Sequence, residues 1–284
     1  MNRRSKTLES LKFAQKKRKK IILTTLLSFL CFILAILVII LFFRLSFFQI
    51  SKIKVVGTLK IDISSIEKDV FDELLDDYAF YIPKSNTFFY PKEKIENKLL
   101  RLHKEIDTVS IRREGLSGIL ININERKAEA LICNGFFDED NEGRECFSVD
   151  KDGYVFEKSP FLFEEIFTRY YFNSMDNKII LGTYFIDIDL FKQLQKFTKT
   201  IQEKNISTNG ILIGEDGQYE LYIKNPDLSD CIVYFDDRVP FDKTAENLIA
   251  FWNNSQNNSG NIKKQVNYDY INLRFGNNIF YVTK

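Results

Sequence analysis

The sequence has one histidine, one tryptophan and four cysteines, so several kinds of functional site lack the residues they need. Structural zinc sites use four Cys or His ligands, which His103 with Cys133 and Cys146 does not supply. No glycine-rich phosphate-binding loop and no G-x-S-x-G nucleophile motif occurs. His103 stands at the end of an amphipathic helical pattern, where a cation interacts favourably with the helix dipole. The sequence therefore predicts a non-enzymatic protein with no metal, cofactor or small-molecule substrate.

Charge, proline and glycine are all absent from residues 21–43. As a helix rising 1.5 Å per residue, this segment is roughly 34 Å long, enough to cross a hydrocarbon core of about 30 Å. The alternative is a buried helix of a soluble protein, but such helices seldom stay apolar on every face for this length. Residues 21–43 are therefore predicted to form a transmembrane signal anchor.

The two flanks of this segment differ in charge. Residues 1–20 carry nine basic side chains and one acid (net +8), which leaves −7 for the rest of a chain whose total is +1. The positive-inside rule then predicts a cytoplasmic N-terminus and an extracytoplasmic C-terminus. After Phe43 the chain reads RLSFFQI, which offers no small-x-small cleavage site, so the anchor is expected to remain uncleaved. The near-neutral total gives no indication of nucleic-acid binding.

Residues 48–126 show the pattern of a small α+β domain. The expected elements are a strand at Ile50–Gly57, a helix opened by the capping box Ser64–Glu67, a helix after Pro91, and strands at Thr108–Arg113 and Gly118–Glu125. The expected buried helix positions are Ile66, Val70, Leu74, Tyr78, Ile95, Leu99 and Leu102. The order of elements is therefore β-α-α-β-β.

The hydrophobic pattern of residues 127–284 predicts a second, mixed β-rich domain with helices packed on one sheet. Strands are expected at Ala128–Cys133, Cys146–Val149, Tyr154–Phe156, Ile211–Ile213, Glu220–Ile223 and Cys231–Phe235, with a closing strand at Ile279–Val282. Helices are expected around Leu190–Ile201 and at Asp242–Trp252, an acidic loop at Phe137–Gly143, and a surface loop at Asn253–Asn261.

Several of these stretches resemble the FtsQ/DivIB family of bacterial cell-division proteins. The similar segments are FFQISKIKVVG and, later, VSIRREGLSGILININERKAEAL. Where the family reads E-R-x-P-x-A, this chain has Glu125-Arg126-Lys127-Ala128-Glu129-Ala130, so Ala128 replaces the usual proline. The residues Asp150, Gly153 and Phe156 match a family D-x-x-G-x-x-F pattern, and Ile271–Phe275 match a terminal I-D-L-R-F pattern with Asn272 in place of Asp.

The resemblance implies a fold and a function. It implies a cytoplasmic tail (1–20), an anchor (21–43), a POTRA domain (48–126) and an FtsQ/DivIB-like β domain (127–284). It also implies a protein of the division septum that binds FtsB/DivIC-like and FtsL-like membrane proteins and other divisome components, and so helps to control septal peptidoglycan synthesis. The alternative is a POTRA-containing membrane-anchored receptor or secretion component that binds polypeptides, although such proteins usually carry several POTRA units or a barrel.

The closing strand is the predicted partner-binding site. Its open edge is expected to accept a strand from another chain, with Arg274 meeting a partner carboxylate and Phe275 providing an apolar anchor. The predicted contact residues are Arg274, Phe275, Ile279, Phe280, Tyr281 and Val282. Two alternatives stay open: Lys284 blunts an ordinary edge, or Phe275 is core and Arg274 packs along the sheet.

The cysteines are expected to behave differently from one another. Cys133 and Cys146 flank the acidic loop between two strands that should pair, in a compartment where disulfides persist, so they are predicted to form a disulfide. Cys31 lies inside the apolar segment, and Cys231 is expected to be buried in a strand.

Overall fold

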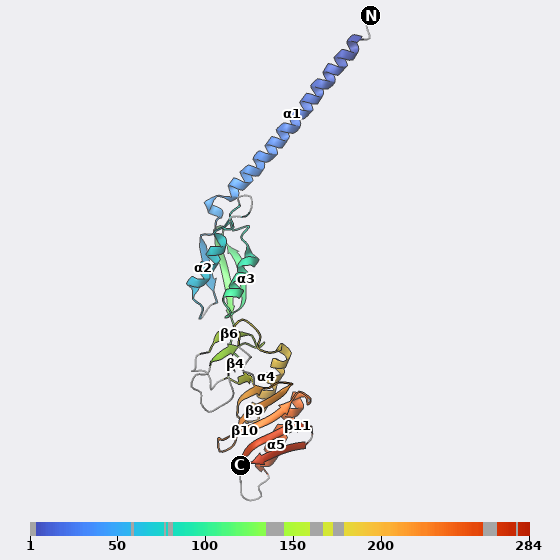
Figure 1. Cartoon of the computed structure of the whole chain (residues 1–284). Helices are drawn as coiled ribbons and strands as arrows, with labels where there is room; N and C mark the ends of the chain where they lie inside the picture. The colour runs from blue at the N-terminus through green and yellow to red at the C-terminus, as the bar shows by residue number, and fades with distance from the viewer. Residues whose placement is uncertain are drawn as a thin grey trace. The chain divides into compact units, whose positions relative to one another are not determined.

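The structure is a computed structural model of the chain (Figure 1), and it describes residues 4–57, 60–76, 78, 82–134, 145–159, 167–172, 179–257, 266–276 and 278–284. The chain forms two compact units. The first consists of Met1–Leu100 with Thr108–Asn124, and the second of Arg101–Asp107 with Glu125–Lys284. The fold is mixed α+β, and each unit contains its own sheet.

Helix α1 (Arg4–Phe43) contains the apolar segment, and its part Lys17–Phe43 is long and apolar enough to cross a membrane. The basic tail does not form a separate element, because α1 begins at Arg4 and neither proline nor glycine interrupts it. The hydroxyls of Thr24 and Thr25 donate to the carbonyls of Lys20 and Ile21 at 2.9 and 3.0 Å. Both threonine hydroxyls are therefore satisfied within the helix.

A short 3-10 turn η1 (Ser46–Phe48) leads from α1 into the first sheet. The elements that follow are β1 (Lys52–Val56), α2 (Ile63–Leu74), α3 (Lys92–Leu102), β2 (Ile106–Glu114) and β3 (Gly118–Glu125). The sheet order is β1-β3-β2, and β1 runs parallel to β3. The expected order β-α-α-β-β is confirmed by these elements.

The core of the first unit follows the sequence pattern with three corrections. Ile66, Val70 and Leu74 of α2 are buried, as are Ile95 and Leu99 of α3. Tyr78 and Leu102 were expected to be buried and are exposed, because Tyr78 comes after the end of α2 and Leu102 is the last residue of α3. Ser64 is not the N-cap of α2: Asp62 takes that position, and its carboxylate accepts the N–H of Ser64.

The second unit is built on a nine-stranded sheet. Its strands are β4 (Ala130–Cys133), β5 (Cys146–Val149), β6 (Val155–Lys158), β7 (Arg169–Phe172), β8 (Thr208–Ile213), β9 (Gln218–Lys224), β10 (Asp230–Asp236), β11 (Tyr268–Phe275) and β12 (Asn278–Thr283). The order across the sheet is β12-β11-β10-β9-β8-β7-β4-β5-β6. The helices among its described residues are α4 (Ile188–Gln202) and α5 (Phe241–Asn257).

Both helices cover the same face of this sheet because of the way the chain crosses it. Helix α4 joins the parallel neighbours β7 and β8, and α5 joins the parallel neighbours β10 and β11. The two crossovers start from strands that run in the same direction, and both step toward β12. Crossovers of this kind are right-handed, which places both helices on one face and leaves the other face without a helix from these connections.

The main core lies between these helices and the sheet. Leu194, Phe197 and Ile201 of α4, with Ala245 and Leu248 of α5, pack in one cluster with the helix-facing residues of the strands. Those strand residues include Tyr170, Ile211, Leu221, Val233, Phe235 and Ile271. A smaller cluster on the opposite face contains Leu131, Cys133, Cys146, Tyr171, Leu212 and Tyr222.

Two features of the second unit differ from expectation. Helix α5 extends to Asn257, so residues 253–257 are helical rather than part of a surface loop, since no proline or glycine ends the helix earlier. Strand β7 was not predicted. The rest of the expected Asn/Ser loop and the acidic stretch 137–143 lie outside the described residues.

Candidate functional site: the edge and open face at β12

Strand β12 lies at one end of the nine-stranded sheet and pairs antiparallel with β11. The register places Asn272 opposite Phe280 and Tyr270 opposite Val282. Within the described residues, no strand pairs with the other side of β12. The outward N–H and C=O groups of β12 therefore form an edge to which an extended segment of another chain can hydrogen-bond.

The predicted contact residues of β12 divide between the two faces of the sheet. Ile279 is half-buried against the main core, and the ring of Tyr281 lies 5.1 Å from that of Phe251 on α5. Because side chains alternate along a strand, Phe280 and Val282 point to the face opposite α4 and α5, which is called the open face. Ile279 and Tyr281 thus take part in packing inside the chain, whereas Phe280 and Val282 belong to the open face.

Phe275 is an exposed residue. Phe275 and Phe280 are each 54% exposed, and their ring centroids are 5.1 Å apart in an edge-to-face arrangement. Lys284 does not blunt the edge, because its ammonium donates to the carbonyl of Asp230 on β10 at 3.0 Å, two strands in from β12. A buried Phe275 and an edge protected by Lys284 disagree with this geometry. The expectation that Arg274 packs along the sheet, in contrast, agrees with its contacts to Asn272 and to Gln218 on β9.

Arg274 is held on the open face by neighbouring polar side chains. Its Nε donates to Oδ1 of Asn272 at 3.1 Å, and its Nη1 lies 3.4 Å from Oε1 of Gln218 on β9. The guanidinium carbon is 5.3 Å from the ring centroid of Tyr234 on β10. These contacts hold a half-buried cation on the open face, and this orientation reduces the rotamer entropy that binding an anionic group would cost.

The tyrosines of the open face were not predicted as part of the site. Tyr234 of β10 and Tyr270 of β11 have ring centroids 5.9 Å apart, and both rings are half-buried. Tyr222 of β9 donates to Oε2 of Glu220 at 2.7 Å, and its pKa is raised by burial and then by this hydrogen bond. The alternation of side chains along β9, β10 and β11 places these tyrosines on one face. Which residues of neighbouring strands lie side by side can be recognised only once the strand register is known.

The disulfide lies toward the opposite end of the same sheet. Cys133 of β4 and Cys146 of β5 are bonded to each other, with Cα atoms 4.1 Å apart, and they are direct partners in the strand register. Both are buried in the smaller cluster. Cys231 is buried in β10, as expected, whereas Cys31 lies on α1.

Two residues quoted for the family resemblance meet in the second unit. Nη1 of Arg126 forms a short ion pair with Oδ2 of Asp150, and the Arg126 guanidinium lies 4.1 Å from the ring centroid of Tyr154. Oδ1 of Asp150 accepts the backbone N–H groups of Asp152 and Tyr154 at 2.9 and 3.0 Å. Asp150 therefore organises the turn between β5 and β6, and this contact has a structural role.

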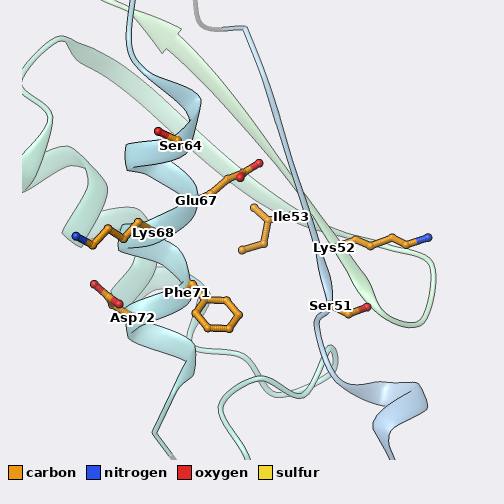
Figure 2. Close-up of a pocket in the computed structure, with 8 residues that line it drawn as sticks. All are labelled: Ser51, Lys52, Ile53, Ser64, Glu67, Lys68, Phe71 and Asp72. Carbon is orange, nitrogen blue, oxygen red and sulfur yellow. The ribbon is translucent and has the colours of Figure 1, made fainter.

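A second candidate site is a pocket of about 600 Å³ between β1 and α2 in the first unit. It is lined by Ser51, Lys52, Ile53, Ser64, Glu67, Lys68, Phe71 and Asp72. Figure 2 shows Ile53 pointing from the strand toward the helix, where Phe71 and Glu67 approach it, while Lys52 points away from the helix. Strand β1 is also an edge strand, so the pocket adjoins backbone groups that can pair with a peptide.

His103 follows the end of α3 and is half-buried. Over the described residues, no group of three or more His, Cys, Asp or Glu side chains is placed to hold a metal ion. No known family model and no curated protein sequence matches the chain.

Proposed function

We propose that this chain is a bitopic membrane protein that docks a partner protein on the outer edge of β12, as its resemblance to the FtsQ/DivIB family implies. In this proposal α1 is the anchor, the N-terminus is cytoplasmic, and both sheets are extracytoplasmic. The partner is a membrane protein similar to FtsB/DivIC, itself paired with one similar to FtsL. The protein acts as a non-enzymatic scaffold at the division septum and helps to control septal peptidoglycan synthesis.

The observation that carries this proposal is the combination of an open edge with an open face at β12. An extended partner segment gains main-chain hydrogen bonds from the edge, and its side chains reach Phe275, Phe280 and Val282. Aromatic residues and arginines dominate most interface energies, and the guanidinium of Arg274 lies against the ring of Tyr234 on the open face. A carboxylate on the partner can pair with the Arg274 guanidinium, which lysine would not reproduce.

The first unit supports the same assignment. Its elements follow the order β1, α2, α3, β2, β3 directly after α1, which is the order that a POTRA domain behind a single span would have. As a POTRA domain it would recruit or position other divisome components, while the second unit docks the FtsB/DivIC-like protein.

The test measures binding of the full-length protein, in detergent, to the FtsB/DivIC-like protein of the same organism. Adjacent residues of a strand direct their N–H groups to opposite sides, so either Phe280→Pro or Tyr281→Pro removes an N–H that faces the partner. Whichever of the two variants removes the N–H that faces the partner should lose binding. Arg274→Glu should weaken binding by roughly 30-fold, corresponding to about 2 kcal/mol for an interface hot spot.

The matched control is Phe71→Glu in the pocket of the first unit, which should bind normally. If folded Arg274→Glu, Phe280→Pro and Tyr281→Pro proteins all keep the affinity of the unmodified chain, β12 is not the docking site. Loss of septal localisation of a fluorescent fusion carrying the same changes would link the binding to division.

A second candidate function is a membrane-anchored receptor that binds extended polypeptides, and the pocket between β1 and α2 favours it. There an incoming peptide would pair with β1 and place apolar side chains against Ile53 and Phe71. The same two sets of variants separate the functions: this candidate predicts that Phe71→Glu abolishes cross-linking to an unfolded polypeptide, whereas changes at β12 leave it intact.

A further inference from the structure

Phenylalanines gather where α1 ends, and two of them come from a loop far along the chain. Phe43 is the last residue of α1, and its ring centroid lies 6.2 Å from that of Phe88 and 5.1 Å from that of Phe89. Phe48 of η1 lies 5.7 Å from Phe88. Phe47 continues the group through Phe48 at 5.5 Å. The loop of residues 82–90 is thus brought directly against the end of the apolar helix.

The buried side chain of Asn86 and two backbone hydrogen bonds hold this loop in place. Asn86 is fully buried, and its Nδ2 donates to the carbonyl of Phe43 at 2.7 Å, which satisfies one of the carbonyls left open at the end of α1. The N–H of Thr87 donates to the carbonyl of Phe48 at 2.8 Å, and the N–H of Ile50 to that of Ser85 at 2.7 Å. The Asn86 Oδ1 accepts the N–H of Phe88 at 2.9 Å, which sets the direction of that residue.

The exposed rings of this group are Phe47, Phe88 and Phe89, which are 62%, 46% and 44% exposed. They are linked through the rings of Phe48 and Phe43 into one aromatic group, and an exposed apolar group of this kind marks a contact with another apolar phase. The ring centroids of Phe88 and Phe89 lie 6.2 and 5.1 Å from that of Phe43. In the anchoring proposed above, they therefore stand at the level at which α1 leaves the hydrocarbon core. Beside them, the guanidinium of Arg113 lies 4.5 Å from the ring centroid of Phe88.

We propose that the loop of residues 82–90 is a second membrane contact, in which Phe88 and Phe89, together with Phe47, insert into the boundary between headgroups and acyl chains of the outer leaflet. This inference rests on the membrane anchoring proposed above for α1. Aromatic side chains enter this boundary to a depth of about 5–10 Å, and a neighbouring arginine can pair with lipid phosphate. Arg113, whose guanidinium lies against the Phe88 ring, is therefore placed to pair with a headgroup phosphate when that ring inserts. The loop fixes the first unit at the membrane surface.

The test uses the full-length protein reconstituted in phosphatidylcholine bilayers that carry bromine either near the glycerol end or near the methyl end of the acyl chain. Bromine quenches tryptophan on contact. The probe variants are Phe88→Trp and Phe89→Trp, and the constant background of Trp252 is measured in the unmodified chain. We expect both probes to lose fluorescence in the lipid brominated near the glycerol end and to keep it in the other.

Two control variants separate this inference from the anchor itself. Phe32→Trp, in the middle of the apolar segment, should be quenched by the lipid brominated near the methyl end if α1 spans the bilayer. Ile63→Trp, at the start of α2 and roughly 16 Å along that helix from its end, should not be quenched by either lipid. The end of α2 is the part near the loop, since Lys84 donates its N–H to the carbonyl of Asp76 at 3.1 Å.

Each outcome decides between the explanations. Quenching at residue 32 with none at 88 and 89 overturns the loop contact and leaves the anchor standing. Blue-shifted but unquenched probes at 88 and 89 mean that protein covers the patch, which also overturns it. If residue 32 is not quenched by either lipid, the anchoring fails, and the lipid contact of the loop fails with it.

Discussion

At the residue scale, Gly57 shows why a glycine must follow the last residue of β1. Its φ is +93°, and a Cβ at this position would lie 2.2 Å from the carbonyl oxygen of Ile123 on β3. Both the backbone conformation and the contact with another strand therefore exclude a side chain. The glycine at the end of the sequence FFQISKIKVVG is thus required by the parallel pairing of β1 with β3.

We predict that Gly57→Ala destabilises the first sheet much more than Gly115→Ala does. Gly115 also has a positive φ (+70°), but nothing lies within 4 Å of its Cβ position, so it should lose only about 1–2 kcal/mol for the left-handed conformation. Gly57→Ala carries the clash in addition. Hydrogen exchange of the β1 and β3 amides in the full-length protein measures the destabilisation caused by each variant. Equal effects would mean that contact with Ile123 does not matter.

The buried thiol of Cys231 gives a second prediction at this scale. Burial raises the pKa of Cys231 from 9.0 to about 12, against a smaller opposing effect of Lys284. At about pH 8 the folded protein should then hold roughly a thousandfold less thiolate, which is the reactive form, than an unfolded chain does. In a Cys31→Ser background, iodoacetamide should label Cys231 only after denaturation. Equal labelling rates in native and denatured protein would contradict this.

The same shift predicts the direction of a pH effect on stability. Between about pH 9 and pH 12 the unfolded chain has lost the Cys231 proton that the folded protein keeps. The contribution of this group is therefore complete below pH 9 and declines as the pH rises above it.

At the scale of elements, the disulfide ties β4 to β5 where the two strands are already in register. Its two cysteines are 13 positions apart in the sequence. Closing a loop of this length is predicted, from chain entropy, to stabilise the folded protein by about 3 kcal/mol. We expect reduction to lower the free energy of unfolding of the second unit by this amount in guanidinium titrations.

The matched control for the disulfide is the double variant Cys133→Ala with Cys146→Ala. Its unfolding midpoint should not respond to reductant, because both thiols are gone. Mass spectrometry of alkylated protein establishes whether the bond was open in each sample. Alkylation of both Cys133 and Cys146 together with an unchanged midpoint in the unmodified chain would refute the predicted stabilisation.

At the scale of the whole molecule, the charge asymmetry around residues 21–43 predicts which side of a membrane the two sheets occupy. The +8 charge before residue 21 predicts that a reporter active only outside the cytoplasm works when fused after Lys284 and fails at the N-terminus. Replacing the five residues at 16–20 with uncharged ones should weaken this preference. Activity only at the N-terminal fusion would reverse the proposed orientation.

The sequence by itself determined the features that depend on local pattern. The end of α1 at Phe43, the order of elements in the first unit and most strands of the second followed from apolar periodicity over a few residues. The pairing of Cys133 with Cys146 was also predictable, because adjacent strands joined by one loop usually pair. Patterns failed at element ends, as at Ser64 and residues 253–257, where one hydrogen bond or an extra turn decides the boundary.

Only the tertiary structure decided what depends on residues far apart in the chain. The open edge of β12 was expected from the sequence, but the two crossovers that step in one direction place α4 and α5 on one face of the sheet, and Tyr222, Tyr234 and Arg274 come together on the other face. Likewise, the amide of Asn86 meets the carbonyl of Phe43 across 43 positions. Such contacts arise from the packing of complete elements, whose relative placement is set by the buried cores and by the handedness of their connections rather than by neighbours in sequence.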